Sequence, residues 1–174
     1  DYTEQNPIIV PDNTVIKGDG LRGCIIRPAN ANQDMLRVRN ACYFGEFTFR
    51  DGVDENQVPL IAFDYAVAFD DPFDTSVSRE GYTNLPSTRP TITTSPYIQN
   101  ASIISFLGGN GAKIDGSKVE SPNVPVYAIE AENPTIGAVP EQGKSMVANA
   151  FTILSFGGTA WRLTNDAYAQ IVSC

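Results

Sequence analysis

The sequence predicts an all-β fold: a right-handed single-stranded parallel β-helix (a solenoid) with two long loop insertions. Three observations lead to this prediction. Short apolar runs are bounded by turn-forming residues, an Asn recurs between such runs, and no stretch keeps a helical period over ~11 residues. With 174 residues and 42% hydrophobic content, the chain can form one domain with its own core. We therefore predict a single β-helix domain spanning residues 1–174.

The apolar runs have the length of strands, and Gly, Pro, Asn or Asp bounds each of them. They lie at 8–10, 14–17, 24–27, 35–38, 47–50, 60–69, 96–99, 102–106, 112–115, 145–148, 151–156, 160–163 and 168–173. Three strands of ~4 to 6 residues with short turns make a coil of ~20 to 25 residues, so we expect roughly six coils.

The recurring Asn has a physical explanation in a solenoid. Asn tolerates the left-handed backbone conformation better than most residues, so it can form a sharp bend between two strands. Bends of successive coils lie above one another, and stacked amides can hydrogen-bond along the stack. We predict structural bends of this kind at Asn13, Asn40, Asn100, Asn149 and Asn165.

Two segments are too long for a minimal coil, namely about 70–96, rich in Pro, Ser and Thr, and 117–143, rich in Pro and Glu. We expect long loops that leave the solenoid wall and either contact partners or ligands or serve as decoration. A β-sandwich or β-barrel is the alternative fold. Both predict hairpin turns, but the Asp-Gly pairs at 51–52 and 115–116 lead into long polar stretches.

Composition argues against several classes of function. A net charge of −8 without a basic cluster makes nucleic acid or an anionic membrane an unexpected partner. Histidine is absent, which removes the Ser-His and Cys-His nucleophile systems. Cys24, Cys42 and Cys174 form no zinc motif, so we expect buried, unpaired thiols. The Gly-rich turns match no phosphate-binding loop, and we predict neither metal nor cofactor.

Carboxylates and aromatic rings offer an alternative function, binding or cleavage of polysaccharide. Glycoside hydrolysis needs two carboxylates a few ångströms apart, and acidic residues at strand ends are otherwise ordinary turn formers. The candidates for such a pair are Asp64, Asp70, Asp71 and Asp115. Tyr82 and Tyr127, one in each predicted loop, are candidates for stacking on a sugar ring.

Parts of the chain resemble known families. Residues 4–30, EQNPIIVPDNTVIKGDGLRGCIIRPAN, resemble the first coils of pectin-lyase-like β-helices. The runs at 79–103 and 144–174 resemble large virion structural proteins of T-even-like tailed phages that infect marine cyanobacteria and other marine bacteria. The resemblance spans nearly the whole chain.

The resemblance implies a non-catalytic β-helical module of a tail-fibre, baseplate or neck-associated virion protein. Its partners would be other virion proteins, in a homo-trimer or multi-subunit assembly. Its location would be the tail or neck region of the virion, and the host cytoplasm before assembly. Host surface glycan is a possible further ligand. A carbohydrate-active β-helix (hydrolase, lyase or glycan-binding tailspike) and a bacterial adhesin on the same solenoid are the rival interpretations. Because strand-like runs reach both ends of the sequence, we expect a part of a longer polypeptide.

Overall fold

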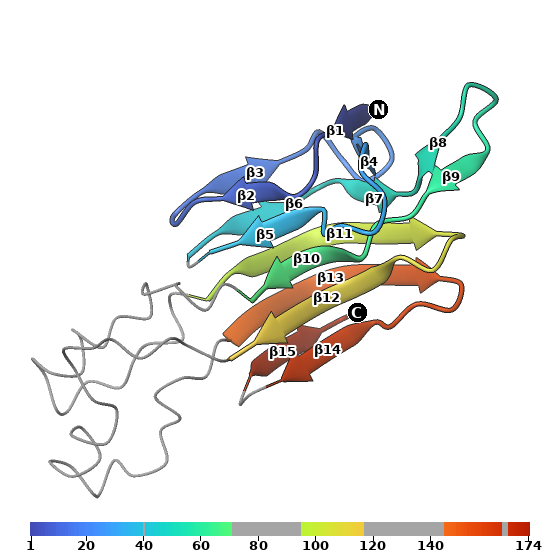
Figure 1. Ribbon diagram of the computed structural model, residues 1–174. Coiled ribbons are helices and arrows are strands. Elements are labelled where there is room, and N and C mark those ends of the chain that lie inside the picture. The colour runs from blue at the N-terminus through green and yellow to red at the C-terminus, as the bar shows by residue number, and fades with distance from the viewer. Residues whose placement is uncertain (40, 71–94, 117–144, 165–166) are drawn as a thin grey trace, which may run out of the picture.

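The computed structural model describes residues 1–39, 41–70, 95–116, 145–164 and 167–174 (Figure 1). These residues form strands joined by turns and bends, and they include no helix. Accordingly, the described part of the chain has no long apolar helix of the kind that crosses a membrane. The prediction of an all-β fold is confirmed for these residues.

In the described ranges, fifteen strands are distributed over two parallel sheets and one hairpin. Sheet A has eight strands, and its longest path runs in the order β1-β4-β7-β11-β13-β15. Its members are β1 (Tyr2–Glu4), β3 (Val15–Lys17), β4 (Ile25–Pro28), β6 (Tyr43–Gly45), β7 (Thr48–Arg50), β11 (Tyr97–Ser105), β13 (Ser145–Ser155) and β15 (Tyr168–Val172).

Sheet B has five strands in the order β14-β12-β10-β5-β2. They are β2 (Ile8–Val10), β5 (Leu36–Val38), β10 (Tyr65–Phe69), β12 (Asn110–Asp115) and β14 (Trp161–Thr164). The antiparallel hairpin consists of β8 (Gly52–Val53) and β9 (Pro59–Ile61).

The chain alternates between the two sheets, and each return adds a parallel strand beside the previous one (Figure 1). We call one strand of sheet B with the sheet A strands that follow it a rung. Parallel strands need crossover connections, and here the other sheet supplies them. Sheet B has five strands, so the described residues contain five rungs, one fewer than the expected six. Two parallel sheets traversed in this way are consistent with a β-solenoid.

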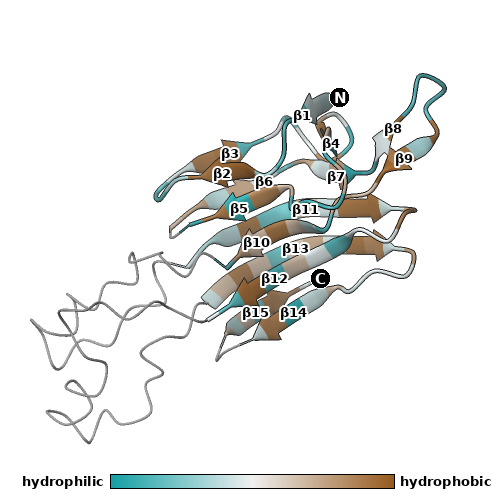
Figure 2. Cartoon of the chain, viewed as in Figure 1, coloured by the Kyte–Doolittle hydropathy of each residue, from teal (hydrophilic) through white to brown (hydrophobic). Residues whose placement is uncertain are grey.

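The core consists of apolar columns that run from rung to rung. In sheet A, Phe44, Ile98 and Ala148 are registered neighbours and each is fully buried. In sheet B, Leu36, Val67 and Ala112 form an equivalent buried column. The two sets belong to one hydrophobic cluster, so the facing sides of the sheets supply a common core. Figure 2 shows brown, hydrophobic segments in the strands of both sheets.

Two of the predicted Asn bends have left-handed backbones, at Asn13 (φ 59°) and Asn100 (φ 50°). The prediction was wrong at Asn149, because the left-handed residue is the next one, Ala150 (φ 52°). The strand register explains the difference, since Gln99 pairs with Asn149 and Ala101 with Phe151, so that Ala150 lies beside Asn100. Asn40 and Asn165 lie outside the described residues.

Left-handed residues form a column at this bend, and few of them are Asn. Glu46, Asn100, Ala150 and Ser173 occupy equivalent positions, with φ between 50° and 61°. One side-chain link joins them, from the Asn100 amide to the Glu46 carboxylate at 2.7 Å. A strand continues through the bend in β11 and β13, so the runs predicted separately at 96–99 and 102–106, and at 145–148 and 151–156, are two continuous strands.

All connections from sheet B to sheet A leave from the same ends of the sheet B strands. They comprise residues 11–14, 39–42, 70–96, 116–144 and 165–167. The two long loops predicted at about 70–96 and 117–143 correspond to the third and fourth connections. Nearly all of their residues lie outside the part of the chain that the structure describes.

Candidate functional site

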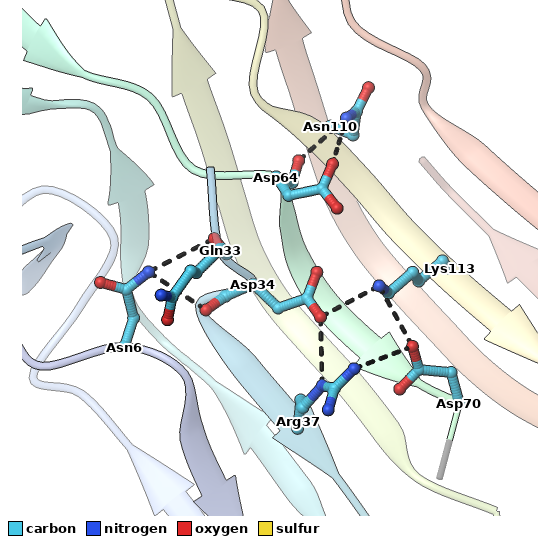
Figure 3. Close-up of polar contacts among 8 residues, drawn as sticks. All are labelled: Asn6, Gln33, Asp34, Arg37, Asp64, Asp70, Asn110 and Lys113. Carbon is cyan, nitrogen blue, oxygen red and sulfur yellow. Dashed lines mark hydrogen bonds and ion pairs between the residues drawn. The ribbon is translucent and has the colours of Figure 1, made fainter. Parts of the chain in front are cut away.

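Four charged residues meet on sheet B, and we call Asp34, Arg37, Asp70 and Lys113 the charge cluster (Figure 3). Asp34 precedes β5, Arg37 lies within β5, Asp70 follows β10 and Lys113 lies in β12. Because β5, β10 and β12 are neighbours in sheet B, the cluster connects three successive rungs.

Each carboxylate of the charge cluster contacts both cations. The ammonium nitrogen of Lys113 lies 3.0 Å from Oδ2 of Asp34 and 3.1 Å from Oδ2 of Asp70. The Arg37 guanidinium donates from Nε to Asp34 at 3.2 Å and from Nη2 to Asp70 at 3.4 Å. Two positive and two negative charges therefore balance within one network.

The balance of charges is important because the Asp34 carboxylate is buried, and a buried charge without a partner is costly. The Asp34 side chain is only 6% exposed, whereas that of Arg37 is 47% exposed. Burial by itself would lower the pKa of Lys113, but hydrogen bonds and charge attraction to Asp34 and then Asp70 outweigh it, so the pKa is raised. The ammonium also lies 5.2 Å from the centre of the Tyr65 ring, a cation–π contact.

The arrangement of the charge cluster favours a structural role over sugar hydrolysis. Since Oδ2 of Asp34 and of Asp70 both contact the Lys113 nitrogen, they lie no more than about 6 Å apart, close to the separation in retaining glycosidases. However, the Lys113 ammonium contacts both carboxylate oxygens, and the Arg37 guanidinium contacts them as well. The cluster is therefore an ion-pair clamp across rungs.

The candidate carboxylate Asp64 does not form a pair with Asp70. Asp64 and Asp70 flank the five-residue strand β10, and an extended chain of that length places them roughly 20 Å apart. The Asp64 carbonyl and carboxylate accept hydrogen bonds from the Asn110 amide at 2.9 and 3.3 Å (Figure 3). Asp115 ends β12. Asp71, Tyr82 and Tyr127 lie outside the described residues.

Asp51 is a second polar centre, and sequence reasoning did not identify it. It is 2% exposed, and its carboxylate accepts hydrogen bonds from the Ser105 hydroxyl at 2.7 Å and from the backbone N–H groups of Phe106 and Leu107 at 2.6 and 3.2 Å. Arg27 donates to its carbonyl at 2.5 Å. These partners lie on neighbouring rungs, so Asp51 fixes the corner after β11.

Amide side chains also join the strand entrances of sheet B. The Asn6 amide donates to the carbonyls of Gln33 and Asp34, both at 3.3 Å (Figure 3). Farther along the sheet, Asn110 donates to Asp64 and accepts from the backbone of Thr159 at 2.7 Å. Rung-to-rung amide bonding therefore exists at Asn6 and Asn110, which were not predicted, and at one predicted bend, Asn100, which donates to Glu46.

No group of three or more His, Cys, Asp or Glu residues suited to hold a metal ion occurs in the described ranges. All three cysteines are free thiols. Cys42 is buried and Cys24 half-buried, but Cys174 is exposed, which corrects the expectation of three buried thiols.

Asp34, Arg37 and Lys113 were missed by sequence reasoning, which identified only Asp70 of the charge cluster. Arg37 lies on the outward side of a strand that alternates buried and exposed positions, and this alternation was the only signal nearby. The residues around Asp34 do not indicate that Lys113, two rungs away, lies next to it. That contact depends on the register of β5, β10 and β12. Comparison with protein-family models, curated proteins and solved structures found no match.

Proposed function

We propose that the chain is a rigid structural module of a tailed-phage virion, a right-handed parallel β-helix within a tail-fibre, baseplate or neck-associated protein. The rigidity of the proposed module is supported by the apolar columns, which continue from rung to rung between the two parallel sheets. A continuous backbone ladder over a packed core resists bending and proteolysis, as the task of a spacer or fibre demands.

Polar contacts support the same role, because they join rungs to each other. The charge cluster connects three strands of sheet B, and Asp51 connects the corner after β11 to the preceding rung. The assignment to a phage virion is supported by the resemblance of residues 79–103 and 144–174 to virion proteins of marine phages.

Peptide mass spectrometry of purified particles of the phage that encodes the chain tests this proposal. We expect peptides from these residues in the particle, belonging to one longer polypeptide at a fixed ratio to the major capsid and tail proteins. Peptides that are abundant in the lysate but absent from washed particles would contradict it.

A carbohydrate-active β-helix is tested separately, through the charge cluster. With Lys113 and Arg37 in contact with both carboxylates, we expect no sugar release from a panel of bacterial surface polysaccharides that includes the host's. Release that is lost in Asp70→Asn, but kept in the hairpin variant Asp54→Asn, would instead establish the hydrolase function.

A further inference from the structure

One buried oxygen of the charge cluster has no hydrogen-bond partner among the described residues. The Asp34 side chain is 6% exposed, and its Oδ2 contacts both Arg37 and Lys113, but no described group donates to its Oδ1. Buried carboxylate oxygens are normally paired, because a buried acceptor without a donor lowers stability by more than a hydrogen bond contributes. Asp34 Oδ1 therefore points to a further ligand at this place.

The unpaired oxygen faces a second carboxylate on the next rung. Figure 3 shows Asp34 Oδ1 directed toward the carboxylate of Asp64. Backbone hydrogen bonds hold the two segments side by side, since the Asp64 N–H donates to the Gln33 carbonyl at 2.9 Å and the Met35 N–H to the Tyr65 carbonyl at 2.8 Å. An ionised carboxylate offers only acceptors, so neither side chain can satisfy the other.

Asp64 also leaves this region with an excess negative charge. It is half-buried, and the one described side chain that donates to its carboxylate is the uncharged Asn110 amide, at 3.3 Å. The ion pairs of the charge cluster do not include it. The cluster holds two carboxylates and two cations, and Asp64 adds a third carboxylate, so one negative charge is unbalanced within the described residues.

The chemistry of these oxygens favours one kind of ligand. A water molecule could donate to both carboxylates, but it would leave the excess charge unbalanced. Carboxylate oxygens suit hard cations. Ca²⁺ takes roughly six to eight oxygen ligands, whereas the described ranges contain no group of three acidic side chains suited to a metal ion. A divalent ion would also reverse the excess charge beside the Lys113 ammonium, and a monovalent cation would cancel it.

We propose that Asp34 Oδ1 and the Asp64 carboxylate bind one monovalent metal cation, of the Na⁺ or K⁺ class, where the chain enters sheet B. The cation is the missing partner of Oδ1, while Arg37 and Lys113 remain on Oδ2. Because the ligands come from the rungs of β5 and β10, binding links the stability of sheet B to the cations in solution. The site is independent of a virion role.

Thermal unfolding of the whole chain in matched chloride salts tests the proposal. The salts are NaCl, KCl and tetramethylammonium chloride at equal concentrations, so that screening is the same in each. Tetramethylammonium is the reference, because its methyl groups prevent direct coordination by oxygen. We expect a higher Tm in NaCl or KCl, with a difference that saturates and reaches roughly 3–6 °C at about ten times the Kd.

Asp64→Asn separates cation binding from folding. The substitution removes the excess charge and places an amide donor beside Asp34 Oδ1, so this variant should be at least as stable as the native chain in tetramethylammonium chloride. Its Tm should no longer depend on the cation. The matched control is Asp54→Asn, which makes the same change of charge in the exposed hairpin turn and should keep the full cation effect.

Three results would each overturn the proposal. One is the same Tm in all three salts, which would indicate that a water molecule fills the site. Another is a difference between the salts that persists in Asp64→Asn, which would place the cation elsewhere. The third is a larger shift with millimolar CaCl₂ than with NaCl at far higher concentration, which would indicate a divalent ion.

Discussion

Single buried polar residues hold the corners of this molecule in place. Asp51 accepts three hydrogen bonds from residues 105–107 while being 2% exposed. A carboxylate in that position accepts hydrogen bonds from donors that would otherwise lack a partner. Leaving a buried donor without a partner costs more free energy than a hydrogen bond contributes to stability.

Replacement of Asp51 should therefore be costly. We expect Asp51→Ala to lower the free energy of unfolding by roughly 3 kcal/mol, because it leaves the N–H of Phe106 and the Ser105 hydroxyl without an acceptor. Urea denaturation measures the effect. Asp54→Ala is the control, since Asp54 accepts two backbone hydrogen bonds in the exposed hairpin turn, and it should cost less than about 1 kcal/mol. Equal losses in the two variants would contradict the assigned role.

The bend at Ala150 is a site of backbone strain, because its φ of 52° is unfavourable for a residue with a Cβ. Ala150→Gly should raise the free energy of unfolding by about 0.5–1 kcal/mol, as measured in urea. The same substitution at Ala101, which is fully buried in an ordinary stretch of β11, should lower it by about 1 kcal/mol. Destabilisation by Ala150→Gly would argue against the left-handed bend.

At the scale of the elements, close approach of neighbouring strands limits which residues are tolerated. Gly45 in β6 is paired with Gln99 in β11, and a Cβ on Gly45 would overlap the Gln99 backbone carbonyl. Gly45→Ala should lower the free energy of unfolding by about 3 kcal/mol, because strands β6 and β11 would have to separate. Gly23→Ala, whose nearest neighbour would be 3.9 Å away, should change thermal stability little. A neutral Gly45→Ala would contradict the register of these strands.

The clamp between β5, β10 and β12 makes stability depend on alkaline pH. Because the pKa of Lys113 is raised in the folded protein, its contribution is fully present below the pKa of an unfolded Lys, about 10.4. It disappears as the pH rises through the higher folded value. Urea unfolding between pH 8 and 12 measures the difference in the free energy of unfolding between the native chain and Lys113→Met. This difference should shrink as the pH rises above the pKa of Lys113 in the folded protein. A difference that does not change with pH would contradict the ion-pair clamp.

Strands were predictable from sequence where their own residues alternate or form a compact apolar run. The runs at 8–10, 35–38 and 112–115 match β2, β5 and β12 closely. By contrast, β1 has one aromatic and two polar residues, and its strand conformation depends on its parallel pairing with β4. The charge cluster could not be predicted from sequence either, because Lys113 lies next to Asp34 only through the register of the sheet B strands.

At the scale of the whole molecule, the connections from sheet B to sheet A differ greatly in length, from residues 165–167 to residues 116–144, although they leave the same ends of equivalent strands. Loop-closure entropy grows slowly with length, by about 0.6 kcal/mol for each doubling. Descendants of this chain can therefore gain or lose whole stretches of sequence at that corner while the ladder of rungs is inherited unchanged. One side of the molecule is free to diversify under selection, and the scaffold behind it is not.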